Sequence, residues 1–186
     1  MKNILKIVFL SIVGFSFLIY FTIPENKSEK NIRLEQKVEN LPKNFEVYGD
    51  NIAKESIFSK NSYIVLLNHD SLAVFKDLYK KTNKNIILIA NVSNTPWIIK
   101  NIAVNSELQK LYKDSKIGLI NDENGYFRRF FDIKNDEQNI YFVYKIEDDL
   151  SIKEIVKAYV KKGALQNGVL DTEIDKSLED FLANLK

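Results

Sequence analysis

The feature that most limits what this chain can fold into is an unbroken apolar run, Tyr63–Leu67, which stops at four polar residues, 68–71. A short continuous apolar run bounded by turn-forming residues is typical of a strand buried on both faces of its sheet. A helical pattern begins at Leu72, directly afterwards. Open α/β sheets place their ligands at such a strand-to-helix junction. Here the junction holds the only histidine of the chain, His69.

A second apolar run at 85–90 indicates another buried strand, and the residues between the two runs have helical spacing at 72–81. A strand, a ten-residue helix and a strand with short connections form a βαβ unit, so we expect these strands to be parallel neighbours. Either Asp70 or Ser71 is expected to cap the helix, because short polar side chains accept hydrogen bonds from the first free N–H groups.

The other elements are predicted from local patterns and turn residues. They are an edge strand or hairpin near 45–52, an apolar segment after Pro96, a helix from Ser106, a strand at 116–120, a short helix at 126–131, two antiparallel strands at 140–146 and 152–160, and a closing helix from Asp171 or Thr172. Strands that alternate with helices predict the α/β class, here as a single domain over residues 41–186 with a mixed central sheet.

The N-terminal residues 1–24 resemble a membrane anchor or an uncleaved signal. Two lysines, Lys2 and Lys6, precede seventeen uncharged residues at 7–23, which as a helix reach about 26 Å, near the minimum for a bilayer core. No small-residue cleavage motif follows, which favours an uncleaved anchor over a cleaved signal. The polar residues 25–40 are predicted to be a linker between this anchor and the domain.

An anchor of this kind predicts a single-pass protein of the bacterial inner membrane, with residues 7–23 in the bilayer and the C-terminal domain in the periplasm. The alternative is cleavage that leaves a soluble periplasmic domain. The basic residues after the apolar segment outnumber those before it, which weakens the positive-inside argument for this orientation. Export of the domain is favoured because the segment stands at the extreme N-terminus.

Composition excludes several classes of function. The chain carries 27 basic and 25 acidic residues; four of the lysines and two of the glutamates lie in residues 1–30, so residues 31–186 are balanced. A balanced domain lacks the basic field that nucleic acid requires, so nucleic-acid binding is not expected. The chain has no cysteine, which excludes thiol redox chemistry, disulfides and thiolate zinc sites. With one histidine, a metal site built from several histidines of one chain is excluded as well. Neither a metal nor a cofactor is predicted.

Several local phrases, together with the order of elements, resemble the thioredoxin-like superfamily. Residues 41–45, Leu-Pro-Lys-Asn-Phe, are similar to the entry of its TlpA/ResA and peroxiredoxin-like branches, and 57–68 are similar to their lead-in to the central strand. Residues 117–125 resemble their strand followed by D-x-x-G, and 140–144 resemble their late strand. The resemblance covers residues 41–186 and implies a three-layer α/β/α sandwich.

The chain departs from that family at its redox residues. The family carries a C-x-x-C motif or a single reactive cysteine before its first helix, whereas this chain has only residues 68–71 there. The proline that precedes the late strand is also missing, since residues 136–139 read Asp-Glu-Gln-Asn. The resemblance therefore implies no catalytic residue and no thiol oxidoreductase activity. The YtfJ-like proteins are an analogous, periplasmic group of the superfamily without usable thiols, although no motif assigns this chain to them.

A polar cleft is predicted where the two parallel strands end. The side chains expected to line it are His69, Asp70, Asn91, Ser93 and Asn94, with Thr95 beside them. Polar residues at the carboxyl ends of parallel strands meet at one edge of the sheet. The alternative reading is that these residues are ordinary helix caps and turn formers. A divalent metal bound by His69, Asp70 and Asp122 is only weakly suggested, because carboxylates in turns usually serve the turn itself.

A second candidate surface is the apolar segment that contains Trp97, Ile99 and Ile102. A helix that is apolar over so much of its circumference cannot bury every side against one sheet, so part of it is predicted to meet a protein partner or the membrane. The alternative is that all three residues belong to the core. The chain is thus expected to be a membrane-anchored, non-redox binding or scaffold module, and not an enzyme. The alternative function is a non-thiol enzyme or small-ligand-binding protein that uses the cleft.

Overall fold

The computed structural model describes residues 6, 11–16, 18, 35–49, 57–95 and 104–185. Residues 11–16 are helical, but no helix in the described part of the chain is both long and apolar enough to cross a membrane. Most of the predicted transmembrane segment, residues 7–23, lies outside the described residues.

The domain is built on a six-stranded mixed sheet with the strand order β1-β4-β3-β2-β5-β6. The strands are β1 Glu46–Tyr48, β2 Tyr63–Leu67, β3 Ile86–Ala90, β4 Leu119–Asn121, β5 Ile140–Ile146 and β6 Ile152–Tyr159. β2, β3 and β4 are mutually parallel, whereas β1, β5 and β6 each run antiparallel to their neighbours. The α/β class and the mixed sheet are confirmed, as is the parallel pairing of the first two apolar strands.

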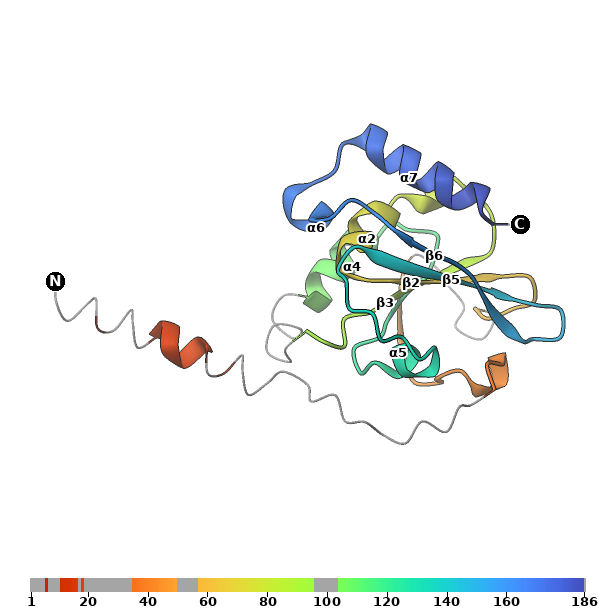
Figure 1. Cartoon of the computed structure of the whole chain (residues 1–186), viewed down its shortest axis with the longest axis horizontal. Helices are drawn as coiled ribbons and strands as arrows, with labels where there is room; N and C mark the ends of the chain where they lie inside the picture. The colour runs from red at the N-terminus through yellow and green to blue at the C-terminus, as the bar shows by residue number, and fades with distance from the viewer. Residues whose placement is uncertain are drawn as a thin grey trace.

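Helices cover both faces of the sheet (Figure 1). The helical elements are η1 Val38–Asn40, α2 His69–Phe75, η3 Leu78–Lys80, α4 Asn105–Tyr112, α5 Tyr126–Phe130, α6 Ala164–Asn167 and α7 Asp171–Ala183. α2, α4 and α7 pack on one face, in a core that includes Leu72, Leu108 and Phe181. α5 packs on the other face with Phe127. α2 and α4, which follow β2 and β3 in the chain, thus lie on the same side of the sheet.

The central strand β2 is buried along its whole length. Its alternate residues point to opposite faces: Val65 belongs to the core under α2, α4 and α7, and Leu66 belongs to the core above α5. β2 pairs with β3 from Tyr63↔Ile86 to Leu67↔Ala90, and with β5 on its other side from Tyr63↔Lys145. Because both edges and both faces are covered, an unbroken apolar run is the sequence that this position requires.

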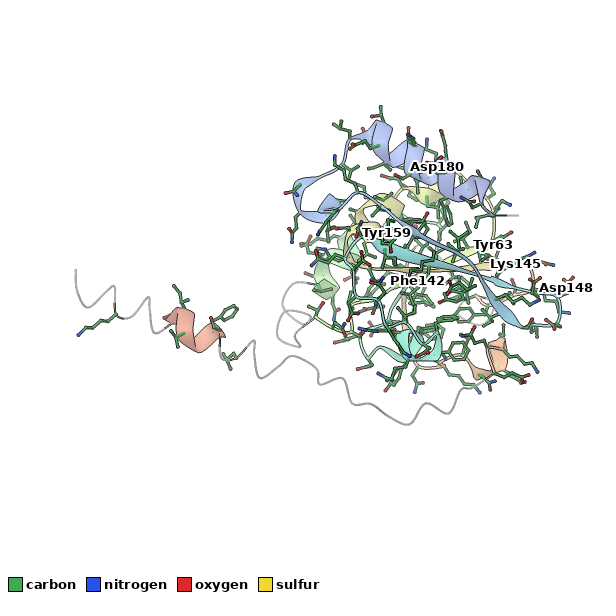
Figure 2. The ribbon with its side chains drawn as sticks, in the orientation of Figure 1. Tyr63, Phe142, Lys145, Asp148, Tyr159 and Asp180 are labelled. Carbon is green, nitrogen blue, oxygen red and sulfur yellow. The ribbon has the colours of Figure 1, made fainter. Side chains whose placement is uncertain are left out.

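The hairpin of β5 and β6 forms one side of the sheet, with Asp148 near its turn and Tyr159 at its open end (Figure 2). Asn61, at a positive φ of 58°, donates from Nδ2 to Asp148 Oδ1 over 2.8 Å and so fastens the turn to the residues before β2. At the same end, Ile152 N donates to the carbonyl of Gln36 over 2.8 Å. The chain before the sheet therefore adds one antiparallel rung, Lys37↔Ser151, to the edge.

The predicted bounds of the first helix and its predicted cap both need correction. The first helix spans His69–Phe75 and not 72–81, and residues 78–80 form the separate 3-10 helix η3. Neither Asp70 nor Ser71 caps α2: the N-cap position is Asn68, without a side-chain cap bond. Ser71 Oγ donates to the carbonyl of Ile140 over 3.1 Å, and the Asp70 carboxylate binds elsewhere. Neither side chain caps α2, because each makes its hydrogen bonds with residues far along the chain.

Candidate functional site

The carboxyl ends of β2 and β3 are joined by a chain of amide hydrogen bonds. Asn91 donates from Nδ2 to Asn68 Oδ1 over 2.8 Å, and Ser93 Oγ donates to Asn91 Oδ1 over 3.1 Å. Asn68 in turn donates from Nδ2 to the carbonyl of Glu137 over 2.8 Å. These bonds fix the turns that follow both strands relative to the loop before β5, and they give the site a rigid polar base.

Beside this base lies an open cleft of about 260 Å³. It is bounded by α2, the turn after β3, α4 and α6. The lining residues are His69, Leu72, Asn91, Val92, Thr95, Val104, Glu107, Leu108, Leu111 and Leu165. Six of these ten side chains are aliphatic, and the polar ones come from α2, from the turn after β3 and from the first part of α4. The cleft is therefore an apolar hollow with polar groups on part of its wall.

The two helical walls of the cleft are held together by a buried tyrosine. Tyr112, at the end of α4, is fully buried and donates from its hydroxyl to the carbonyl of Leu72 over 2.9 Å. Burial raises the pKa of the Tyr112 phenol far above its ordinary value, so the hydroxyl stays a proton donor. That bond joins α2 to α4 and so helps to fix the width of the cleft between these two helices.

His69 is the polar group on the α2 side of the cleft. Its side chain is 43% exposed, but Nδ1 is buried and makes no hydrogen bond with any described residue. Nδ1 lies 3.5 Å from Asp70 Oδ1, which is longer than a hydrogen bond of normal strength. His69 and Asp70 therefore do not form an oriented acid–base pair in this arrangement.

Asp70 turns away from the cleft and into the protein. Its side chain is 1% exposed; Oδ2 accepts from Gly163 N over 2.7 Å, and Oδ1 accepts from Leu165 N over 3.3 Å. Gly163 has a φ of 77° and stands at the N-cap of α6, a left-handed conformation that favours glycine. Asp70 thus holds the start of α6 and places Leu165 against the cleft.

The predicted polar residues are only partly brought together. His69, Asn91 and Thr95 line the cleft, and Ser93 reaches it indirectly through its bond to Asn91. Asn94 is exposed and does not line the cleft, and Asp70 lies behind its wall. The predicted partner residues Trp97, Ile99 and Ile102 lie outside the described residues.

The acidic turn after β4 serves a structural purpose. Asp122 is buried, and its carboxylate accepts from the N–H groups of Phe127 and Arg128 at 3.2 and 2.9 Å, which caps α5. Burial raises the pKa of the Asp122 carboxyl, although these N–H donors act to lower it. In the described part of the chain no three residues of the metal-binding types His, Cys, Asp and Glu are grouped as ligands. The two buried carboxylates are instead used by helices: Asp122 accepts at the start of α5, and Asp70 accepts at the start of α6.

The α6 wall of the cleft was not predicted from the sequence. Leu165 belongs to α6, which has only four residues and is too short to show a helical period of apolar residues. The one available signal was Gly163 itself, since glycine often supplies a left-handed turn before a new element. Leu108 and Leu111 are apolar residues of the helix predicted from Ser106, but nothing in their spacing shows that they border a cavity.

A comparison with models of protein families found no match for this chain, and a comparison with curated proteins found none either.

Proposed function

We propose that this chain is a thiol-free, thioredoxin-like binding module that holds a small, largely apolar molecule at the carboxyl ends of β2 and β3. The observation that carries the proposal is the cleft of about 260 Å³, with its aliphatic lining and its few polar groups. Concave, mostly apolar sites with a small number of placed polar groups are typical of small-molecule binding. Their position at the carboxyl ends of parallel strands is the usual one in α/β folds.

The strand order supports the thioredoxin-like part of the proposal. β2, α2, β3, α4 and β4 form a parallel βαβαβ unit, and an antiparallel hairpin and the closing helix α7 follow. Helices on both faces of the sheet agree with a three-layer sandwich (Figure 1). Fold resemblance alone gives no activity, so the function is argued from the site.

The side chains at the cleft favour binding over catalysis. A general base needs a partner that orients it, and His69 Nδ1 has no hydrogen bond with a described residue. The nearest carboxylate, Asp70, is already bonded to two backbone N–H groups. Since the sequence contains no cysteine, a thiol nucleophile is also excluded.

The location of the module is proposed from the sequence. Residues 7–23 carry no charge and follow two lysines, which favours an anchor in the bacterial inner membrane with the domain in the periplasm. A phosphatase fused after Lys186 should then be active in intact cells, and the same fusion without residues 1–24 should be inactive. Activity that survives this deletion, or an inactive full-length fusion, would contradict the proposed export.

A protein partner is a second part of the proposal. The apolar residues Trp97, Ile99 and Ile102 remain the predicted docking patch. A pull-down with the wild type and with the double substitution Trp97→Ala, Ile99→Ala tests the patch, and an unchanged set of partners would exclude it.

The binding function is tested by what the protein retains during purification. We expect organic extracts of the purified full-length protein to contain a small molecule that is absent after Leu165→Trp, because the indole fills the cleft. Ile155→Trp is the matched control: Ile155 is equally exposed, at 38%, but lies on β6 away from the cleft. A molecule retained equally by both variants, or no retained molecule, would count against binding in the cleft.

A further inference from the structure

From the chemistry of the cleft walls we infer the class of the ligand: an uncharged amphiphile with an aliphatic chain of about ten carbon atoms and a hydroxyl or amide end group. This inference rests on the proposed binding function and adds the identity of the ligand to it. Three features of the cleft carry it, namely its aliphatic lining, its uncharged polar groups and its lack of a free charge.

The apolar part of the cleft fits an aliphatic chain. Leu72, Val92 and Leu108 are nearly fully buried and form its floor, and three more aliphatic side chains form its walls. Among the described lining residues there is no Phe, Tyr or Trp to stack on an aromatic ring. A closed cavity of about 150 Å³ holds benzene, so a volume of about 260 Å³ suits a chain of about ten carbon atoms.

The polar groups of the cleft are able both to donate and to accept. Asn91 uses one amide hydrogen on Asn68 and one lone pair on Ser93, which leaves it one of each. The hydroxyl of Thr95 and the imidazole of His69 complete the polar lining near the strand ends. An end group that itself donates and accepts, such as a hydroxyl or an amide, satisfies these groups without carrying a charge.

A negatively charged end group is disfavoured by its surroundings. No Lys or Arg is found among the described lining residues. Glu107 on the lining is paired with the ammonium group of Lys110, and the Asp70 carboxylate behind His69 is negatively charged and buried. An anion moved into the cleft would lose its hydration and would meet no unpaired Lys or Arg among the described lining residues.

A positively charged end group on the ligand is also disfavoured in the cleft. The Glu107 carboxylate already pairs with Lys110 Nζ at 2.8 Å, and this pair is well exposed to solvent. The Asp70 carboxylate is buried and engaged by the backbone of Gly163 and Leu165. An ammonium group in the cleft would thus find no carboxylate that is both accessible and unpaired, and it would lose its own hydration.

The inference is tested with three photoreactive probes that share a ten-carbon chain bearing a diazirine and differ only in the end group: hydroxyl, carboxylate or ammonium. The full-length protein in amphipol is dialysed against equal free concentrations of each probe near neutral pH, irradiated and digested. Labelled peptides are then mapped by mass spectrometry. We expect the hydroxyl probe to label the peptides that contain Leu108, Leu111 or Leu165 about tenfold more than either charged probe.

The controls separate this inference from the function on which it rests. Labelling of these peptides should fall in Leu165→Trp and persist in Ile155→Trp. If a charged probe labels the cleft as strongly as the hydroxyl probe, the ligand class is wrong while cleft binding stands. If none of the three probes labels the cleft above the level in Leu165→Trp, both the ligand class and the proposed binding function are overturned.

Discussion

The buried carboxylate of Asp70 accepts a hydrogen bond of 2.7 Å from the backbone N–H of Gly163, which ties the start of α2 to the start of α6. The two residues are 93 positions apart in the chain. The same carboxylate also accepts from Leu165, a wall of the cleft. The shape of the cleft therefore depends on a residue that does not line it.

The first prediction concerns this bond. Asp70→Asn removes the charge and one acceptor oxygen, so we expect the free energy of unfolding to fall by about 2–3 kcal/mol. The amides of Gly163 and Leu165 should lose protection in hydrogen exchange, because one of them loses its acceptor oxygen and the other is left with a neutral amide oxygen in place of a carboxylate. Asp180→Asn, on the surface of α7 (Figure 2), is the control and should change neither quantity. Unchanged protection at both amides in Asp70→Asn would contradict the assigned role.

The second prediction concerns the amide chain at the strand ends. Asn68 is 4% exposed and bridges Asn91 and the carbonyl of Glu137. Asn68→Ala leaves both partners without that bond, so we expect a loss of about 1–3 kcal/mol in urea unfolding. Asn94→Ala, at an exposed position of the same region, should stay within about 0.5 kcal/mol of the wild type. Equal losses in the two variants would show that the bridge contributes nothing.

The third prediction compares two glycines in the same left-handed conformation, Gly125 at φ 68° and Gly163 at φ 77°. A Cβ added at Gly125 would stand 2.8 Å from the Cβ of Ser93, whereas at Gly163 it would meet the movable side-chain amide of Asn167. Both alanine variants incur the conformational strain, but only Gly125→Ala adds a clash close to the backbone. We expect Gly125→Ala to lose at least about 1 kcal/mol more in unfolding free energy.

A further substitution separates strain from contact in that experiment. Ser93→Gly removes the side chain that the new methyl group would meet. It also removes the hydrogen bond from Ser93 Oγ to Asn91, so the reference for the double variant is Ser93→Gly alone. In that background Gly125→Ala should cost only the strain seen in Gly163→Ala. If Gly125→Ala costs as much in Ser93→Gly as in the wild type, the close approach of the two turns is not the cause.

The fourth prediction is a pH dependence from Asp122. Burial raises the pKa of its carboxyl in the folded state, so the folded chain binds this proton more tightly than the unfolded chain does. The stabilisation is fully present below the ordinary carboxyl value, about 4, and is lost as the pH rises through the folded value. We therefore expect the wild type to gain stability relative to Asp122→Asn when the pH is lowered from about 7 towards about 4.

Asp149 supplies a control of opposite sign. Its hydrogen bond from the Ser151 side chain, and a second from the Ser151 backbone, lower the pKa of this exposed carboxyl. The wild type should then lose stability relative to Asp149→Asn as the pH falls through the folded value. Urea unfolding of the three proteins across this range checks both signs. Parallel pH profiles of Asp122→Asn and the wild type would contradict the role of burial.

Much of the sheet was predictable because its strands satisfy local rules. Tyr63–Leu67 and Ile140–Ile146 match the predicted bounds, since apolar runs, the second interrupted only by Lys145, suit strands that are covered on both faces. β4 was predicted at 116–120 but spans Leu119–Asn121, and the pairing of β1 with β4 was not predicted. Which strands pair, and over which residues, is decided by contacts between distant segments.

The candidate site was predictable in its location but not in its composition. The rule that parallel strands end at one edge located His69 and Asn91 near each other. Asp70 was misread because a carboxylate at the start of a helix normally caps that helix, and its true partner, Gly163, is remote in sequence. The aliphatic walls at Leu111 and Leu165 follow from the way α4 and α6 pack, which no local pattern reveals.

The place of β2 between β3 and β5 has a consequence for biosynthesis. One ladder of β2 is completed by β3, soon after it in the chain, but the other requires Ile140–Ile146. A nascent chain that has emerged only as far as β4 therefore presents the fully apolar β2 with one unpaired edge, which is a template for misassociation. Because of this strand order, the second edge of β2 is paired only after the chain has been made through Ile146.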